Sequence, residues 1–168
     1  MAGVFATFLE ELEARTAIED CLKRFARAVD RQDWKAAREA YHDGAFDDHG
    51  FFKGPPDAFL VHIAKMHATQ EHSMHFNTNV LIEFLAKDRA FVETYVLVLQ
   101  RFPGLRNLAS ARYLDRFEKR NGEWRVAHRT LVFGDLVAEP VKEAPGFPPE
   151  YTVQKHGMDD PLYRLAKK

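Results

Sequence analysis

The first third of the chain carries apolar residues at the spacing of amphipathic helices. Between about residues 5 and 31 they recur every three or four positions, which predicts a long helix with one buried face. These positions are Leu9, Leu12, Ile18, Leu22, Phe25, Ala26 and Val29. Thr16 and Glu19 have the spacing of a capping box, which favours a break in this helix. A second helix is predicted from Asp33, a candidate N-cap, to a stop signal at Gly44.

The middle of the chain predicts a short strand and a third helix. Residues 45–54 hold β-favouring Phe46 and Phe51 and end in a Gly-Pro-Pro turn, so we expect a short hairpin or an edge strand. Residues 55–72 begin with two prolines, which suit a first helical turn, and continue with apolar side chains on one side. We therefore expect a helix there.

The second half changes to the patterning of β strands. Four segments are rich in β-branched and aromatic residues: 73–86, 89–102, 108–120 and 123–136. Turn pairs separate them: Lys87-Asp88, Pro103-Gly104 and Asn121-Gly122. Asn-Gly between alternating runs is a strong hairpin signal. Helices followed by such a meander predict an α+β fold, in which N-terminal helices pack on a curved antiparallel sheet and enclose a pocket.

Length and composition favour one domain with a covering tail. The 168 residues are 46% hydrophobic and 29% charged, which suits a single core with a polar surface. We assign this domain to residues 1–137. Residues 138–168 are rich in proline and charge, so we expect an irregular tail that covers the pocket or a subunit interface.

The charge balance argues against nucleic acid or a membrane as partner. The 24 lysines and arginines nearly balance the 25 aspartates and glutamates, and they form no basic stripe. The sequence shows neither a basic head before a long apolar run nor a run of spanning length, so we expect no secretory signal and no transmembrane segment. The single cysteine, Cys21, cannot form an internal disulfide, which fits a cytoplasmic location.

Three polar side chains, Asp30, His75 and Arg129, lie within or beside apolar stretches of predicted helix or strand. Asp30 lies near the end of the long helix at the flank of its apolar stripe, so it can reach inward, cap the next helix or meet solvent. Alternation places His75, Asn77 and Asn79 on one face of an apolar strand, and histidine changes charge near neutral pH. Arg129 falls in the last apolar strand, where it needs a salt-bridge partner or a cavity to face.

The histidines His62, His67 and His72 raise the question of a metal site. Residues five apart on a helix point roughly 140° away from each other, so His62 and His67 cannot bind one ion from a common face. A metal site formed by Asp48, His72 and His75 remains geometrically possible from the sequence. The sequence has no HExxH motif, no paired cysteines and no GxGxxG, GxxxxGK(S/T) or GxSxG motif. We therefore expect no metal and no cofactor.

Three stretches together resemble the SnoaL-like branch of the nuclear transport factor 2-like superfamily. They are AIEDCLKRFARAVDRQDWKAAREAYHDGAFDDHGFFKGP, MHFNTNV and YLDRFEKRNGEWRVAHRTLVFGD, and their order covers roughly residues 14–137. The resemblance implies a cone-shaped α+β barrel. Within this branch the chain is similar to hexachlorocyclohexane dehydrochlorinases, and more distantly to scytalone dehydratases and bile acid 7α-dehydratases, which are cofactor-free lyases.

The resemblance also implies a site and a reaction. In the dehydrochlorinases an aspartate at a helix end pairs with a catalytic histidine at a strand start, and these match Asp30 and His75. A catalytic arginine on the last strand assists the leaving group, and its match falls at His128 or Arg129, with Arg129 favoured. The implied activity is a dehydratase or dehydrohalogenase acting on a small, largely apolar, cyclic molecule. The candidate pocket residues are Tyr41, Phe46, Phe51, Phe59, Phe84, Tyr95, Tyr113 and His128.

Two other functions stay open for a chain of this fold. The same cone serves as the non-catalytic small (beta) subunit of ring-hydroxylating oxygenases. It also serves as ketosteroid-isomerase-like isomerases or ligand-binding proteins, in which Asp30 alone would act. Related lyases are trimers, and an open sheet face leaves apolar surface to cover, so we expect a homo-oligomer, a trimer rather than a dimer.

Overall fold

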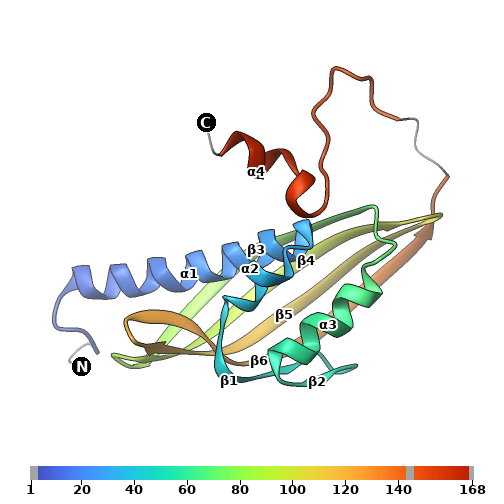
Figure 1. Cartoon of the computed structure of the whole chain (residues 1–168). Helices are drawn as coiled ribbons and strands as arrows, with labels where there is room; N and C mark the ends of the chain where they lie inside the picture. The colour runs from blue at the N-terminus through green and yellow to red at the C-terminus, as the bar shows by residue number, and fades with distance from the viewer. Residues whose placement is uncertain (1–3, 143–145, 167–168) are drawn as a thin grey trace.

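Figure 1 shows the computed structural model, which describes residues 4–142 and 146–166. The long helix α1 runs along one side of a curved six-stranded sheet, and the chain returns to α1 after the last strand. The elements are α1 (Phe8–Arg31), α2 (Trp34–Arg38), β1 (Tyr41–Asp48), β2 (Lys53–Gly54), α3 (Pro56–Met66), β3 (His72–Ala86), β4 (Arg89–Phe102), β5 (Leu105–Arg120), β6 (Glu123–Pro140), a 3-10 helix (Gly157–Asp159) and α4 (Pro161–Leu165).

The sheet confirms the predicted α+β architecture. Its strand order is β2-β1-β6-β5-β4-β3, and every neighbouring pair is antiparallel except β1 with β6. Strands β3 to β6 form the expected meander. Asn121 and Gly122, at the β5–β6 turn, both adopt positive φ (52° and 87°), which a tight two-residue hairpin turn requires.

Local signals explain the helices, with two corrections. Thr7 caps α1 and forms a capping box with Glu10. The predicted break near Arg15 is wrong, because α1 runs without interruption from Phe8 to Arg31. Asp33 caps α2 as expected, since its side chain accepts from the backbone of Ala36 at 3.0 Å. The predicted helix to Gly44 is too long, because Tyr41 is fully buried and begins strand β1.

β-bulges decide which side chains face α1. In β3 the register shifts between Asn77 and Val80, so Val80 turns toward the core and Asn79 is exposed. The prediction that Asn79 shares a face with His75 is therefore wrong. In β6 the register shifts after Val126, and this extra residue turns Arg129 inward.

The main core lies between α1, α3 and the concave face of the sheet. Its buried residues include Ile18 and Leu22 from α1, Phe59 and Ile63 from α3, and Val92, Phe117 and Val126 from the sheet. Phe84 packs against this core, with its ring 4.7 Å from that of Phe5 and 5.9 Å from that of Trp124. Phe84 is thus a packing residue and not part of a pocket wall.

The tail is more ordered than the sequence predicts. Strand β6 continues past residue 137 to Pro140, and the 3-10 helix and α4 dock on the C-terminal end of α1 (Figure 1). Asp160 pairs with Arg31 at 3.3 Å, and the Tyr163 hydroxyl donates to Asp33 at 2.8 Å. Parts of the predicted tail, 143–145 and 167–168, lie outside the described residues. A role of the tail at a subunit interface stays a prediction.

The convex face of the sheet exposes apolar side chains. Phe76, Leu81, Tyr95, Leu97 and Leu108 are each between 43% and 57% exposed. A homo-oligomer would cover such a surface, and the expected trimer or dimer stays a prediction. Among the helices of residues 4–142 and 146–166, none combines the length and apolar character needed to cross a bilayer.

Candidate active site

An apolar cavity of about 320 Å³ opens between α1, α3 and the sheet. Its polar wall residues are His49, His67, His75, Gln100 and Asn107. Its apolar wall residues are Phe25, Val29, Phe51, Phe59, Ile63, Met66, Val96, Val98, Ala109, Ala111, Tyr113, Leu131, Phe133 and Leu136. A mostly apolar wall with a few polar groups is typical of a site for a small organic molecule.

The structure brings Asp30 and His75 together at one wall of this cavity. Asp30 reaches inward from the last turn of α1 and is 5% exposed. Its Oδ1 lies 2.6 Å from Nδ1 of His75. The carboxylate also accepts hydrogen bonds from the backbone N–H of His75 at 3.0 Å and from the Ser73 hydroxyl at 3.0 Å. Strand β3 therefore supplies His75 and also the hydrogen-bond donors that hold the Asp30 carboxylate in place.

Hydrogen bonds keep Asp30 charged despite its burial. Burial raises the pKa of the Asp30 carboxyl, but the hydrogen bonds and charge of His75, with a further bond from Ser73, outweigh it and leave the pKa below its usual value. With Nδ1 of His75 held by Asp30, Nε2 is the nitrogen free to accept a proton. Within the described residues, that Nε2 makes no hydrogen bond.

Arg129 lies one layer behind the cavity wall. Its Nε and Nη2 donate to Asp115 at 2.8 and 2.6 Å, and the side chain is 1% exposed. The guanidinium packs on the ring of Tyr113, 3.9 Å from its centroid, and Tyr113 lines the cavity. The buried salt bridge, one of the two roles considered from the sequence, is therefore present, whereas contact of Arg129 with a leaving group has no support in this geometry.

Only some of the predicted aromatic residues reach the cavity. Those that line it are Phe51, Phe59 and Tyr113. Tyr41 is fully buried outside the wall, and Phe84 belongs to the core. Phe46, Tyr95 and His128 lie away from the cavity: Phe46 stacks on His128 at 5.4 Å, and Tyr95 is 45% exposed beside Arg112. Alternation along the strands turns these three outward, a direction that residue type does not reveal.

Sequence reasoning missed two residues of the cavity region, Asp47 and His49. The Nδ1 atom of His49 contacts Oδ1 of Asp47, and the Tyr41 hydroxyl donates to Oδ2 of Asp47 at 2.6 Å. The one signal in the sequence is a polar run, Asp-Asp-His, inside a phenylalanine-rich segment. A second aspartate–histidine pair therefore belongs to the cavity.

His67 is a cavity histidine that burial keeps neutral. It is 9% exposed, and its Nδ1 is buried without a hydrogen-bond partner among the described residues. Burial, with a contribution from nearby His75, lowers the pKa of His67 to about 4.

This lowered pKa predicts a pH-dependent loss of stability. Between about pH 6.5 and 4, the unfolded chain protonates His67 and the folded chain does not, so the free energy of unfolding falls as the pH falls. Across that window the contribution is up to about 3 kcal/mol. Urea unfolding at several pH values should show a smaller drop for His67→Gln than for the wild type. The same substitution at exposed His62 is the control, and an unchanged slope in His67→Gln would contradict the assignment.

The described residues offer no evident metal site. No group of three or more histidine, cysteine, aspartate or glutamate side chains in residues 4–142 and 146–166 is arranged to hold an ion. His62 instead stacks on the ring of Phe51, with centroids 5.8 Å apart. The expected independence from cofactors stays a prediction.

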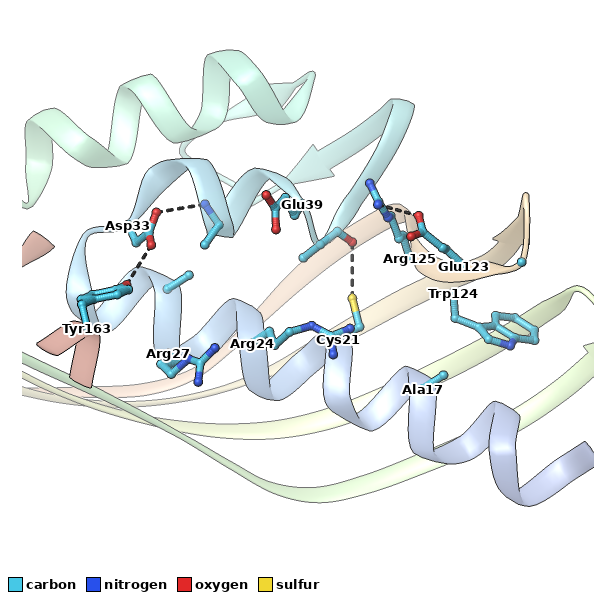
Figure 2. Close-up of a pocket in the computed structure, with 14 residues that line it drawn as sticks. Ala17, Cys21, Arg24, Arg27, Asp33, Glu39, Glu123, Trp124, Arg125 and Tyr163 are labelled. Atoms are coloured by element: carbon cyan, nitrogen blue, oxygen red, sulfur yellow. Dashed lines mark hydrogen bonds and ion pairs between the residues drawn. The ribbon is translucent and has the colours of Figure 1, made fainter. Parts of the chain in front are cut away.

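A second groove, of about 560 Å³, is lined by residues of α1, α2 and the turn between β5 and β6 (Figure 2). Arg24, Arg27, Glu39 and Arg125 give it a mixed charge. Cys21 lies in its wall with Sγ 3.5 Å from a backbone oxygen, and burial raises the pKa of this thiol to about 11. Neither Asp30 nor His75 lines this groove. The mostly apolar cavity that His75 lines is the candidate active site, because an apolar wall with a few polar groups suits a small organic molecule.

Comparisons with known proteins agree with the fold. A gamma-hexachlorocyclohexane dehydrochlorinase of Sphingobium indicum is 29% identical over 126 residues, which are 72% of this chain and 81% of that protein. A candidate scytalone dehydratase of Novosphingobium aromaticivorans matches with a TM-score of 0.72 and 17% identity over 86% of this chain and 99% of its own. A hexachlorocyclohexane dehydrochlorinase of Novosphingobium barchaimii matches with a TM-score of 0.72 and 23% identity, over 85% of this chain and 100% of its own.

The two solved structures are distant in sequence and show that the fold is shared. The family model described as the SnoaL-like domain matches residues 10–130, a span that contains most of α1, the sheet up to the middle of β6 and the Asp30–His75 pair. Because this match covers most of the chain, the protein belongs to the SnoaL-like domain family.

Proposed function

We propose that this protein is a cofactor-independent lyase that removes water or halide from a small, largely apolar, cyclic substrate. One observation carries the proposal: His75 is held by Asp30 at 2.6 Å and faces an apolar cavity with its other nitrogen free. The likeness to a protein named as a dehydrochlorinase supports the reaction class.

The geometry supports His75 as the general base. Its Nε2 accepts the proton from the carbon beside the leaving group, and Asp30 stabilises the imidazolium that forms. Asp30 is a positioning residue, because Ser73 and the backbone of His75 fix its oxygens. A base held in this way contributes on the order of 10² to 10⁴ in rate.

The arrangement disfavours an isomerase in which Asp30 alone moves a proton. Both carboxylate oxygens already accept hydrogen bonds from His75 or Ser73, and the group is 5% exposed. His75 stands between Asp30 and the cavity, since it lines the cavity and Asp30 does not. Proton transfer through His75 is the simpler path.

Product analysis tests the reaction class. We expect the purified protein to convert cyclic ketones with a β-hydroxyl or β-chloro group, or chlorinated cyclohexanes, into the alkene with release of water or chloride. Deuterium at the abstracted position should slow the reaction. Gas chromatography with mass spectrometry measures both the alkene product and the rate of its formation from the deuterated substrate. A product with an unchanged formula would indicate an isomerase, and ligand binding without conversion would indicate a binding protein.

A further inference from the structure

A second aspartate–histidine pair lines the cavity from the opposite margin of the sheet. His49 follows β1 and His75 lies on β3, and the sheet places β6, β5 and β4 between those strands. Both imidazoles line the same cavity. Nδ1 of His49 contacts Asp47, which leaves Nε2 as the nitrogen available to a ligand.

Packing fixes the orientation of the His49 ring. The imidazole stacks on the ring of Phe59, with centroids 4.2 Å apart and an angle of 27° between the planes. Its backbone N–H donates to the carbonyl of Phe52 at 2.9 Å. In the part of the chain that the structure describes, Nε2 of His49 has no hydrogen-bond partner. The ring is therefore preorganised to act on a bound molecule.

The buried carboxyl group of Asp47 has two hydrogen-bonding partners. Asp47 is 0% exposed, and its contacts are with His49 and the Tyr41 hydroxyl. Burial raises the pKa of Tyr41 well above its usual value, so the phenol keeps its proton and supplies no charge. Arg129, the register partner of Asp47 on β6, gives two of its donors to Asp115. Asp47 and Tyr41 therefore form a buried support that holds Nδ1 of His49 in place.

We propose that His49 is a second catalytic residue, a general acid that protonates an oxygen leaving group while His75 accepts the proton from carbon. The C–H electron pair forms the new C=C bond, the C–O bond breaks, and the oxygen leaves as water with the proton of His49. Solvent then returns a proton to His49 and takes the proton from His75. This inference rests on the proposed lyase activity and narrows its substrate to one with a hydroxyl leaving group.

A general acid matters for hydroxide and not for halide. Hydroxide is a poor leaving group unless it is protonated, whereas chloride departs as a stable anion. Two other groups near the cavity are unsuited to donate this proton, because His67 is neutral above about pH 4 and Arg129 lies behind Tyr113. Asp47 and Tyr41 act through His49 as positioning residues.

A matched pair of substrates tests the assignment. The probes are 3-hydroxycyclohexanone and 3-chlorocyclohexanone, with the uncatalysed rate subtracted. In His49→Gln the amide can still contact Asp47 but cannot donate a proton, so turnover of the hydroxy ketone should fall by about 10² to 10⁴. Turnover of the chloro ketone should fall by less than about tenfold. His62→Gln, an exposed position outside the cavity, should leave both rates unchanged.

The outcomes separate failure of the inference from failure of the proposed function. Equal losses on both probes in His49→Gln would overturn the general-acid role and leave the lyase activity standing. No turnover of either probe by the wild type would overturn the lyase activity and the inference with it. If His49→Gln does not fold, the inference can be tested on the wild type alone. The wild type should convert 3-aryloxycyclohexanones at rates that depend only weakly on the acidity of the departing phenol. A steep dependence would contradict the inference.

Discussion

His75→Ala is expected to lower kcat by about 10² to 10⁴ while the protein still folds. The substitution removes the imidazole that lines the cavity, and it leaves the backbone N–H of residue 75 to bind Asp30. Asp30→Asn should produce a loss of similar size, because it removes the charge that orients the imidazole and stabilises its protonated form. Steady-state kinetics with a substrate identified by product analysis measures both effects.

The control for these variants must separate chemistry from folding. Thermal unfolding should show a cooperative transition for each variant, and His62→Gln should retain the wild-type kcat because His62 lies outside the cavity. A similar kcat for His75→Ala and Asp30→Asn, with no further loss in the double variant, would indicate that the two residues act as a unit. Wild-type rates in either single variant would falsify the assignment of the base.

Much of the fold is encoded locally and could be predicted. The three- and four-residue spacing of Ile18, Leu22 and Phe25 fixes the buried face of α1, and Asn121-Gly122 fixes one hairpin. Asp30 could be proposed for the site because it flanks that buried face. Its distance from His75 depends on how α1 lies on β3, which is a long-range feature.

Two β-bulges account for the orientation of Asn79, His128 and Arg129. A β-bulge adds one residue to a strand and reverses the side on which all later side chains lie, and no residue type announces it. One such shift exposes Asn79, and another turns Arg129 inward and leaves His128 outside. Asp47 and His49 were missed because a short strand with adjacent polar residues has no clear alternation.

Removing one partner of the buried Asp115–Arg129 pair is expected to lower the free energy of unfolding by about 3 to 5 kcal/mol. In Asp115→Leu the guanidinium of Arg129, 1% exposed and enclosed by Phe25 and Tyr113, loses the carboxylate that binds two of its nitrogens. In Arg129→Met the fully buried carboxylate of Asp115 is left without its cation. Urea unfolding at neutral pH measures both losses.

The double variant and an exposed pair complete this experiment. Asp115→Leu combined with Arg129→Met leaves no unpaired charge at the site, so it should be more stable than either single variant. Arg112 binds Glu93 at a similar distance, 2.6 Å, but its side chain is 41% exposed, so Arg112→Ala should lower the free energy of unfolding by less than about 1 kcal/mol.

Arg129→Lys distinguishes the two roles considered for this residue. A structural role predicts lower stability with kcat nearly unchanged. Direct assistance to the leaving group predicts a fall in kcat in a variant that is fully folded.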